Sequence, residues 1–196
     1  MASSPPTVLI LGHSFVRRLS SDLRSNFDAR AAEHFNLLGD AVIHLHGVGG
    51  RTVKKLRLYD LGVVSALKPD VIILEIGTND LGANRPEVVG SGIDDLVQLL
   101  LQSYSVRVIG ICEVIPRVRA PFFNTAATIL NQYLTDVLAL SQRFLTYQWM
   151  HGSQLRFGAE LFKMNLLILA PFLFIQLLRT NFASHSNPPR KALPHR

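Results

Sequence analysis

The chain has 196 residues, 48% of them hydrophobic and 17% charged, so it can bury one sizeable core and is not an intrinsically disordered chain. Its net charge of +6 lies mainly in residues 151–196, which contain six Lys and Arg against one acidic residue. Nucleic-acid-binding domains carry a basic stripe across their folded face, so the nearly neutral residues 1–150 argue against that class, and we expect no nucleic-acid partner.

Apolar segments alternate with amphipathic segments along the chain. We expect strands at residues 7–11, 41–45, 71–76 and 106–112, with a weaker one at 144–148, and helices at 15–26, 53–67, 87–103 and 124–142. The expected strands are apolar throughout rather than alternating, which is typical of parallel strands covered by helices on both faces. The sequence therefore predicts an α/β fold with a doubly wound, mostly parallel five-stranded sheet.

Polar clusters follow the first three expected strands, at Ser14, at the glycine turn of residues 47–52 and at residues 77–80. Ligands of open α/β sheets bind beyond the carboxyl ends of the strands, so these clusters can converge. The Ser14 hydroxyl would be a nucleophile, and the Gly50 N–H and the Asn79 amide would donate to the developing oxyanion. Glycine suits position 50 because the backbone there approaches the substrate and can adopt a positive φ.

Each cluster also has a purely structural interpretation. Ser14 could cap the helix that follows it, and Asn79 or Asp80 could cap or close a turn. At one junction alone we would prefer that interpretation. Three junctions in order favour a shared site.

At these residues the sequence resembles the SGNH hydrolases, the GDSL-like serine esterases and lipases. Residues 8–14 are similar to the first block of the family with its nucleophilic serine, residues 49–52 to the second block with its oxyanion glycine, and residues 77–80 to the third. The resemblance covers about residues 7–147 and implies a flavodoxin-like, three-layer α/β/α fold. It implies hydrolysis of a small acyl ester or removal of an acyl group by Ser14, Gly50 and Asn79, assisted by the Ser14 N–H, with no metal or organic cofactor.

Two departures from the family pattern matter. His13 stands where the family usually has an Asp that is not its catalytic acid. More seriously, the family's last block, an Asp-x-x-His that deprotonates the serine, occurs nowhere in the chain. The last aspartate is Asp136, and only Glu160 follows it among acidic residues.

His151 is the best of the remaining candidate bases. Residues 148–151 have the spacing of the missing block, with Gln148 in place of its Asp, but a Gln adds no charge to stabilise an imidazolium. We expect His13 to point away from Ser14. His44 and His46 alternate on a strand without a nearby carboxylate, so they are more easily explained as structural or edge-exposed residues than as a metal site.

Three functional interpretations remain open. The chain can be a weak SGNH-type serine esterase, or a catalytically dead SGNH-fold binding or interaction domain. It can also be an active relative with an altered or truncated C-terminus, as the charge shift and the unusual apolar stretch after about residue 150 suggest.

The domain organisation is expected to be simple. Residues 1–6 would be a disordered N-terminus, 7–180 one domain with an atypical part at 151–180, and 181–196 a disordered basic tail. The uncharged residues 164–178 would form a helix of roughly 22 Å, too short to cross the roughly 30 Å hydrocarbon layer, and Pro171 would kink it. We therefore favour a helix packed on the sheet, with membrane association through this segment and a poorly folded end as the lesser alternatives. The single Cys112 is expected in the core. Without a visible secretory signal, a cytoplasmic location is expected.

Overall fold

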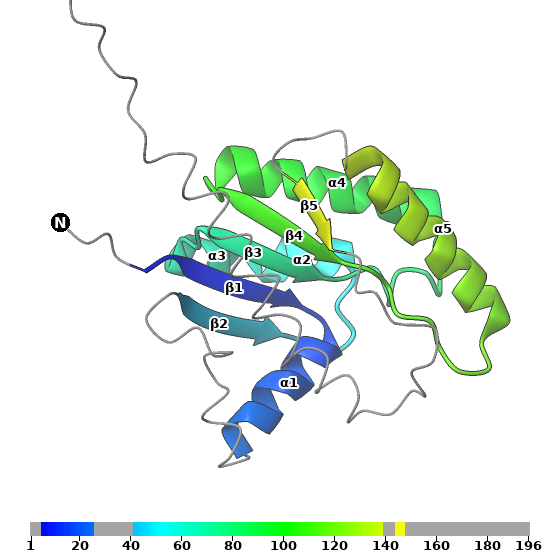
Figure 1. Cartoon of the computed structure of the whole chain (residues 1–196), viewed down its shortest axis with the longest axis horizontal. Coiled ribbons are helices and arrows are strands. Elements are labelled where there is room, and N and C mark those ends of the chain that lie inside the picture. The colour runs from blue at the N-terminus through cyan, green and yellow to red at the C-terminus, as the bar shows by residue number, and fades with distance from the viewer. Residues whose placement is uncertain (1–4, 26–40, 139–143, 148–196) are drawn as a thin grey trace, which may run out of the picture.

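The computed structural model describes residues 5–25, 41–138 and 144–147. Within them, strands alternate with helices along the chain (Figure 1). The strands are β1 (Thr7–Gly12), β2 (Val42–Gly47), β3 (Val71–Glu75), β4 (Val108–Cys112) and β5 (Phe144–Tyr147). The helices are α1 (Ser14–Ser25), α2 (Val53–Tyr59), α3 (Leu61–Leu67), α4 (Pro86–Ser103) and α5 (Pro121–Leu138).

The described strands form one parallel sheet in the order β2-β1-β3-β4-β5. The chain first moves from β1 outward to β2 and then returns across β1 to β3, so the order reverses between β1 and β3. In doubly wound sheets this reversal leaves a crevice at the carboxyl ends of the two strands. The predicted doubly wound, flavodoxin-like α/β fold is confirmed.

The side chains of neighbouring strand residues face opposite sides of the sheet, and both sides are covered. Leu9 and Leu11 belong to the large core formed with the helices from α2 to α5, whereas Ile10 packs with Val16, Leu19 and Leu23 of α1. Figure 1 shows α1 and the α4–α5 pair on opposite sides of the strands. This double coverage explains why the strands are continuously apolar, and Cys112 is buried as expected.

The helix predicted over residues 53–67 is wrong as a single element, because it is divided into α2 and α3 at Asp60. The Asp60 N–H donates to the Leu56 carbonyl, which closes α2, and its own carbonyl accepts from the Val63 N–H. The Asp60 carboxylate is held by side chains from outside the helix, described below. The predicted start of the last helix is also late by three residues, since α5 begins at Pro121.

Other predictions fall outside the described residues. These are the C-terminal segments 151–180 and 181–196, including His151 and the apolar residues 164–178. Among the described helices, none combines the length and apolar character that crossing a membrane requires.

Candidate active site

The three predicted junctions lie at one edge of the sheet, at the reversal point. Gly12 at the end of β1 is in register with Gly47 of β2 on one side and with Glu75 of β3 on the other. The Val48 N–H donates to the Gly12 carbonyl (3.1 Å), and the His13 N–H donates to the Glu75 carbonyl (3.2 Å). The segments that carry Ser14, Gly50 and Asn79 therefore leave the sheet side by side.

Ser14 is the first residue of α1 and is half-buried. The start of α1 lies close against Gly47, the last residue of β2. A Cβ on Gly47 would collide with the backbone nitrogen of Arg17, so this close approach requires a glycine. Among the residues that the structure describes, none accepts a hydrogen bond from the Ser14 hydroxyl. The serine thus lacks a general base within the described part of the chain.

Gly50 has a φ of +70°, a left-handed conformation that side chains rarely adopt, and the space where a Cβ would stand is open. The positive φ considered from the sequence is therefore present. After the turn, Thr52 caps α2 by accepting a hydrogen bond from the Lys55 N–H with its hydroxyl (3.3 Å).

Asn79 and Asp80 hold the Gly50 turn from the side of β3. The Asn79 Nδ2 donates to the Arg51 carbonyl (2.8 Å), and the Asp80 carboxylate accepts from the Val53 N–H (3.1 and 3.2 Å). Two hydrogen bonds thus hold the turn just after Gly50, one to the Arg51 carbonyl and one from the Val53 N–H. For Asp80 the structural interpretation holds, because its carboxylate caps the start of α2.

The Asp80 carboxyl is also the most perturbed titratable group described in the site. Burial raises its pKa to about 6, although the backbone hydrogen bond from Val53 and the nearby His13 favour the charged form. Asp80 is only 7% exposed, so its carboxylate is poorly hydrated. The free-energy cost of ionising it there is larger than the stabilisation that the Val53 N–H and His13 provide.

His13 and Glu75 form a buried pair that the sequence analysis did not identify. The His13 ring is 1% exposed, its Nε2 lies 3.0 Å from Glu75 Oε2, and its Nδ1 accepts from the Phe15 N–H (3.3 Å). Nδ1 is occupied by the Phe15 N–H, and Nε2 faces the Glu75 carboxylate at close range without hydrogen-bond geometry, which agrees with the expectation that His13 is not directed at Ser14. One signal was present in the sequence: Glu75 is the only charged residue in an otherwise apolar strand.

A second cluster lies behind the Gly50 turn, around Asp60. This carboxylate accepts from Arg51 through Nε (2.6 Å) and Nη2 (2.9 Å) and lies 3.2 Å from His46 Nε2. The premise that His46 has no carboxylate nearby is wrong, because the break between α2 and α3 supplies Asp60. His46 is nevertheless structural, as expected, and within the described residues no group of three or more His, Cys, Asp or Glu is arranged to hold a metal.

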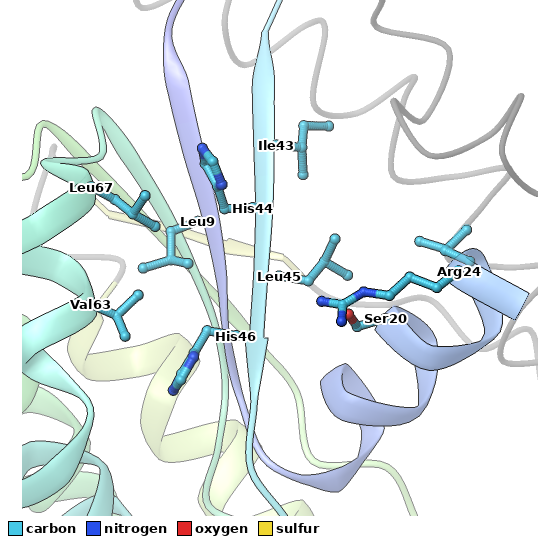
Figure 2. Close-up of a pocket in the computed structure, with 10 residues that line it drawn as sticks. Leu9, Ser20, Arg24, Ile43, His44, Leu45, His46, Val63 and Leu67 are labelled. Atoms are coloured by element: carbon cyan, nitrogen blue, oxygen red, sulfur yellow. The ribbon is translucent and has the colours of Figure 1, made fainter.

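A cavity of about 270 Å³ lies away from these junctions, around the outer edge of β2. Figure 2 shows Ile43 and Leu45 on the side of Ser20 and Arg24, while His44 and His46 lie on the side of Val63 and Leu67. Neither Ser14, Gly50 nor Asn79 lines it. This cavity is therefore distinct from the candidate active site.

Comparison with protein families decides the ancestry of the chain. The model of the GDSL-like lipase/acylhydrolase family matches residues 10–147, which include all three junctions. The chain belongs to this family. No curated protein matches it in sequence.

Solved structures share the GDSL-like fold at low identity. The psychrotrophic esterase EstA from Pseudoalteromonas is 17% identical, with a TM-score of 0.61 over 88% of this chain and 98% of that chain. A GDSL-like lipase from Bacteroides thetaiotaomicron is 15% identical, with a TM-score of 0.55 over 89% of this chain and 93% of that chain. Such distant similarity establishes the fold alone.

An acetylxylan esterase from Geobacillus stearothermophilus also shares this fold. It is 15% identical, with a TM-score of 0.51 over 75% of this chain and 77% of that chain. Its catalytic mutants replace an Asp and a His three positions apart. No Asp and His have this spacing in the present GDSL-like chain.

Proposed function

We propose that this chain is a serine hydrolase that acts on a small acyl ester, with Ser14 as its nucleophile. The observation that carries the proposal is the fastening of the Gly50 turn by Asn79 and Asp80 at the edge of the sheet where Ser14 begins α1. Membership of the GDSL-like lipase/acylhydrolase family supports ester chemistry at this place. No metal or organic cofactor enters the proposed reaction.

Three N–H groups would receive the negative charge on the substrate oxygen. The Gly50 N–H lies in an open turn, and Ser14, as the first helical residue, has an N–H without an acceptor inside its helix. The Asn79 side chain has two N–H bonds, of which one is used by the Arg51 carbonyl and the other stays available. Donors held in advance at such a position stabilise the tetrahedral intermediate without reorganisation.

The reaction would proceed through an acyl-enzyme. The Ser14 oxygen attacks the ester carbonyl while its proton passes to a base, and collapse of the intermediate releases the alcohol, which takes a proton. Water then attacks the acyl group, and the carboxylic acid leaves with Ser14 restored. The proton acceptor is the missing part, since the His13 nitrogens face Glu75 and the Phe15 N–H.

The missing general base limits the rate that we propose. General-base assistance contributes roughly 10²–10⁴-fold, and an oxyanion site alone retains some catalysis. We therefore propose slow turnover of activated esters. The alternative is a binding domain of the same fold without hydrolysis, which is favoured by the absence of any Asp-x-x-His from the sequence.

Hydrolysis of 4-nitrophenyl acetate by the purified full chain tests the proposal. Ser14→Ala is expected to abolish the enzymatic rate, and Asn79→Ala to reduce it. Ser21→Ala, on an exposed turn of the same helix, is the matched control and should leave the rate unchanged. Equal rates for Ser14→Ala and the natural chain would refute the mechanism, and a folded but inactive natural chain would favour the binding domain.

A further inference from the structure

The side chain of Arg17 lies against the turn that contains Gly50. Arg17 follows Ser14 by three positions in α1, a spacing that places both residues on the same side of a helix. A Cβ on Gly49 would stand 3.5 Å from both Cζ and Nη1 of Arg17. The guanidinium therefore lies beside the proposed oxyanion turn, next to Gly49.

The charge of this guanidinium is not neutralised by its described surroundings. Arg17 is exposed, and no carboxylate among the described residues forms an ion pair with it. Arg51 differs in this respect, because the Asp60 carboxylate forms an ion pair with it. The Arg18 guanidinium is directed elsewhere, over the Phe15 ring at 4.9 Å.

The rest of the carboxyl edge of the sheet adds to this positive charge. The segments that follow the strands also carry the exposed residues Arg85, Arg117 and Arg119. Their acidic residues are Glu87, Glu113 and the buried Asp80. With Arg17, four arginines thus stand against three acidic residues, and an excess of one sign of charge attracts ligands of the opposite sign.

We propose that Arg17 forms an anion-binding subsite beside the proposed oxyanion turn, and that the ester hydrolysed at Ser14 carries a carboxylate group. One guanidinium matches a carboxylate in charge and in the spacing of its two parallel N–H bonds. A phosphate dianion carries two negative charges, so binding it here would require further cations directly beside Arg17. This subsite rests on the proposed function, since it names the substrate class of the same site.

A pair of matched esters tests the subsite. The substrate 4-acetoxybenzoate carries a carboxylate, and its methyl ester, methyl 4-acetoxybenzoate, is neutral with the same acetyl group. The measured quantity is the ratio of kcat/KM for the anionic ester to that for the neutral ester. Arg17→Gln is expected to lower this ratio about 5–10-fold, as for the loss of one charge-assisted pair at a partly hydrated position.

Two further variants distinguish a direct contact between Arg17 and the substrate carboxylate from a general attraction by positive charge on the protein surface. Arg17→Lys keeps the charge but loses the fork of donors, so an intermediate ratio is expected. Arg24→Gln removes a charge from the same helix two turns further on, and the ratio should stay within about 2-fold of the natural value, because solvent and salt screen distant charges.

The outcomes distinguish failure of the subsite from failure of the proposed function. If the natural chain hydrolyses both esters and Arg17→Gln changes both equally, the subsite is refuted and the esterase function stands. If neither ester is hydrolysed, the proposed function fails, and NMR titration with the non-hydrolysable 4-acetamidobenzoate then tests the subsite. Binding that weakens at least about 5-fold in Arg17→Gln would support it, whereas binding insensitive to Arg17, or no binding, would refute it.

Discussion

The Asn79 side chain donates a hydrogen bond to the Arg51 carbonyl over 2.8 Å, which joins the loop after β3 to the turn after β2. One side chain thus connects two segments that lie far apart in the sequence. The same turn is held from behind by the Arg51–Asp60 pair. The position of the Gly50 turn therefore depends on side chains from the loop after β3 and from the α2–α3 break.

This connection predicts two effects of a single change at position 79, one on stability and one on catalysis. Asn79→Asp replaces the donor by a carboxylate oxygen that faces the Arg51 carbonyl, so we expect a loss of stability of about 1–3 kcal/mol and a 10²–10³-fold lower kcat, of about the size seen for lost oxyanion donors. Chemical denaturation and ester hydrolysis measure the two effects. Asn84→Ala, which removes a side-chain hydrogen bond to the Asp80 carbonyl in the same loop, is the comparison, and it should cost at most about 1 kcal/mol and leave kcat largely unchanged. An Asn79→Asp variant with natural stability would contradict the geometry.

The raised pKa of Asp80 predicts how stability depends on pH. Between about pH 4 and pH 6 the folded chain keeps a proton on Asp80 that the unfolded chain has released, so this group makes the folded state less stable as pH rises through that window. The shift from 3.8 to about 6 corresponds to about 2–3 kcal/mol.

Asp80→Asn should remove this contribution while keeping an oxygen that accepts from the Val53 N–H. The difference in unfolding free energy between variant and natural chain should therefore grow in favour of the variant from pH 4 to pH 7. Denaturant titrations at several pH values measure it. A difference that is constant with pH would show that Asp80 is not perturbed.

The buried His13–Glu75 pair predicts that the usual family residue would not be tolerated here. His13→Asp places a second carboxyl beside Glu75, which is 7% exposed, so one of the two must stay protonated or the fold must loosen. We expect His13→Asp to lower the stability by about 2–4 kcal/mol at pH 7.

A second change should rescue that variant. In His13→Asp with Glu75→Gln the carboxyl faces an amide that can donate to it, and most of the lost stability should return. Thermal unfolding of the two single variants and the double variant gives the coupling between the sites. Additive effects of the two substitutions would mean that the residues do not interact.

The contacts of Asp60 with Arg51 and His46 predict that removing this carboxylate destabilises the fold and the Gly50 turn together. Asp60→Ala removes the acceptor for both Arg51 and His46 from a position that is 3% exposed, and we expect a destabilisation of about 2–4 kcal/mol. Arg51→Ala should cost less when Asp60 is already absent, which a double-mutant cycle measures. Arg107→Ala is the control, because the Arg107 side chain is 47% exposed and its pair with Asp70 should contribute at most about 1 kcal/mol.

The sheet and its edge were predictable because they depend on local patterns. Continuous apolar runs such as residues 71–74 identify buried parallel strands, and the reversal of strand order then determines where Ser14, Gly50 and Asn79 emerge. The break at Asp60 was not predictable, because its causes, Arg51 and His46, lie nine and fourteen residues away and act through the tertiary structure. The periodicity of residues 53–67 continues across it.

The His13–Glu75 pair was missed for a similar reason. A single charged residue at the end of an apolar strand gives no indication of its partner until the register of β1 and β3 is known. The general base, for which His151 was the best candidate, lies outside the described residues if it exists.

Covalent labelling of Ser14 tests the central claim most directly. The full chain is incubated with a fluorophosphonate, which forms a covalent adduct with an activated serine, and the adduct is located by peptide mass spectrometry. The account predicts one slowly formed adduct on Ser14, lost in Ser14→Ala and slowed in Asn79→Ala. An adduct on another serine, or hydrolysis of esters by a chain that never carries the label on Ser14, would contradict it.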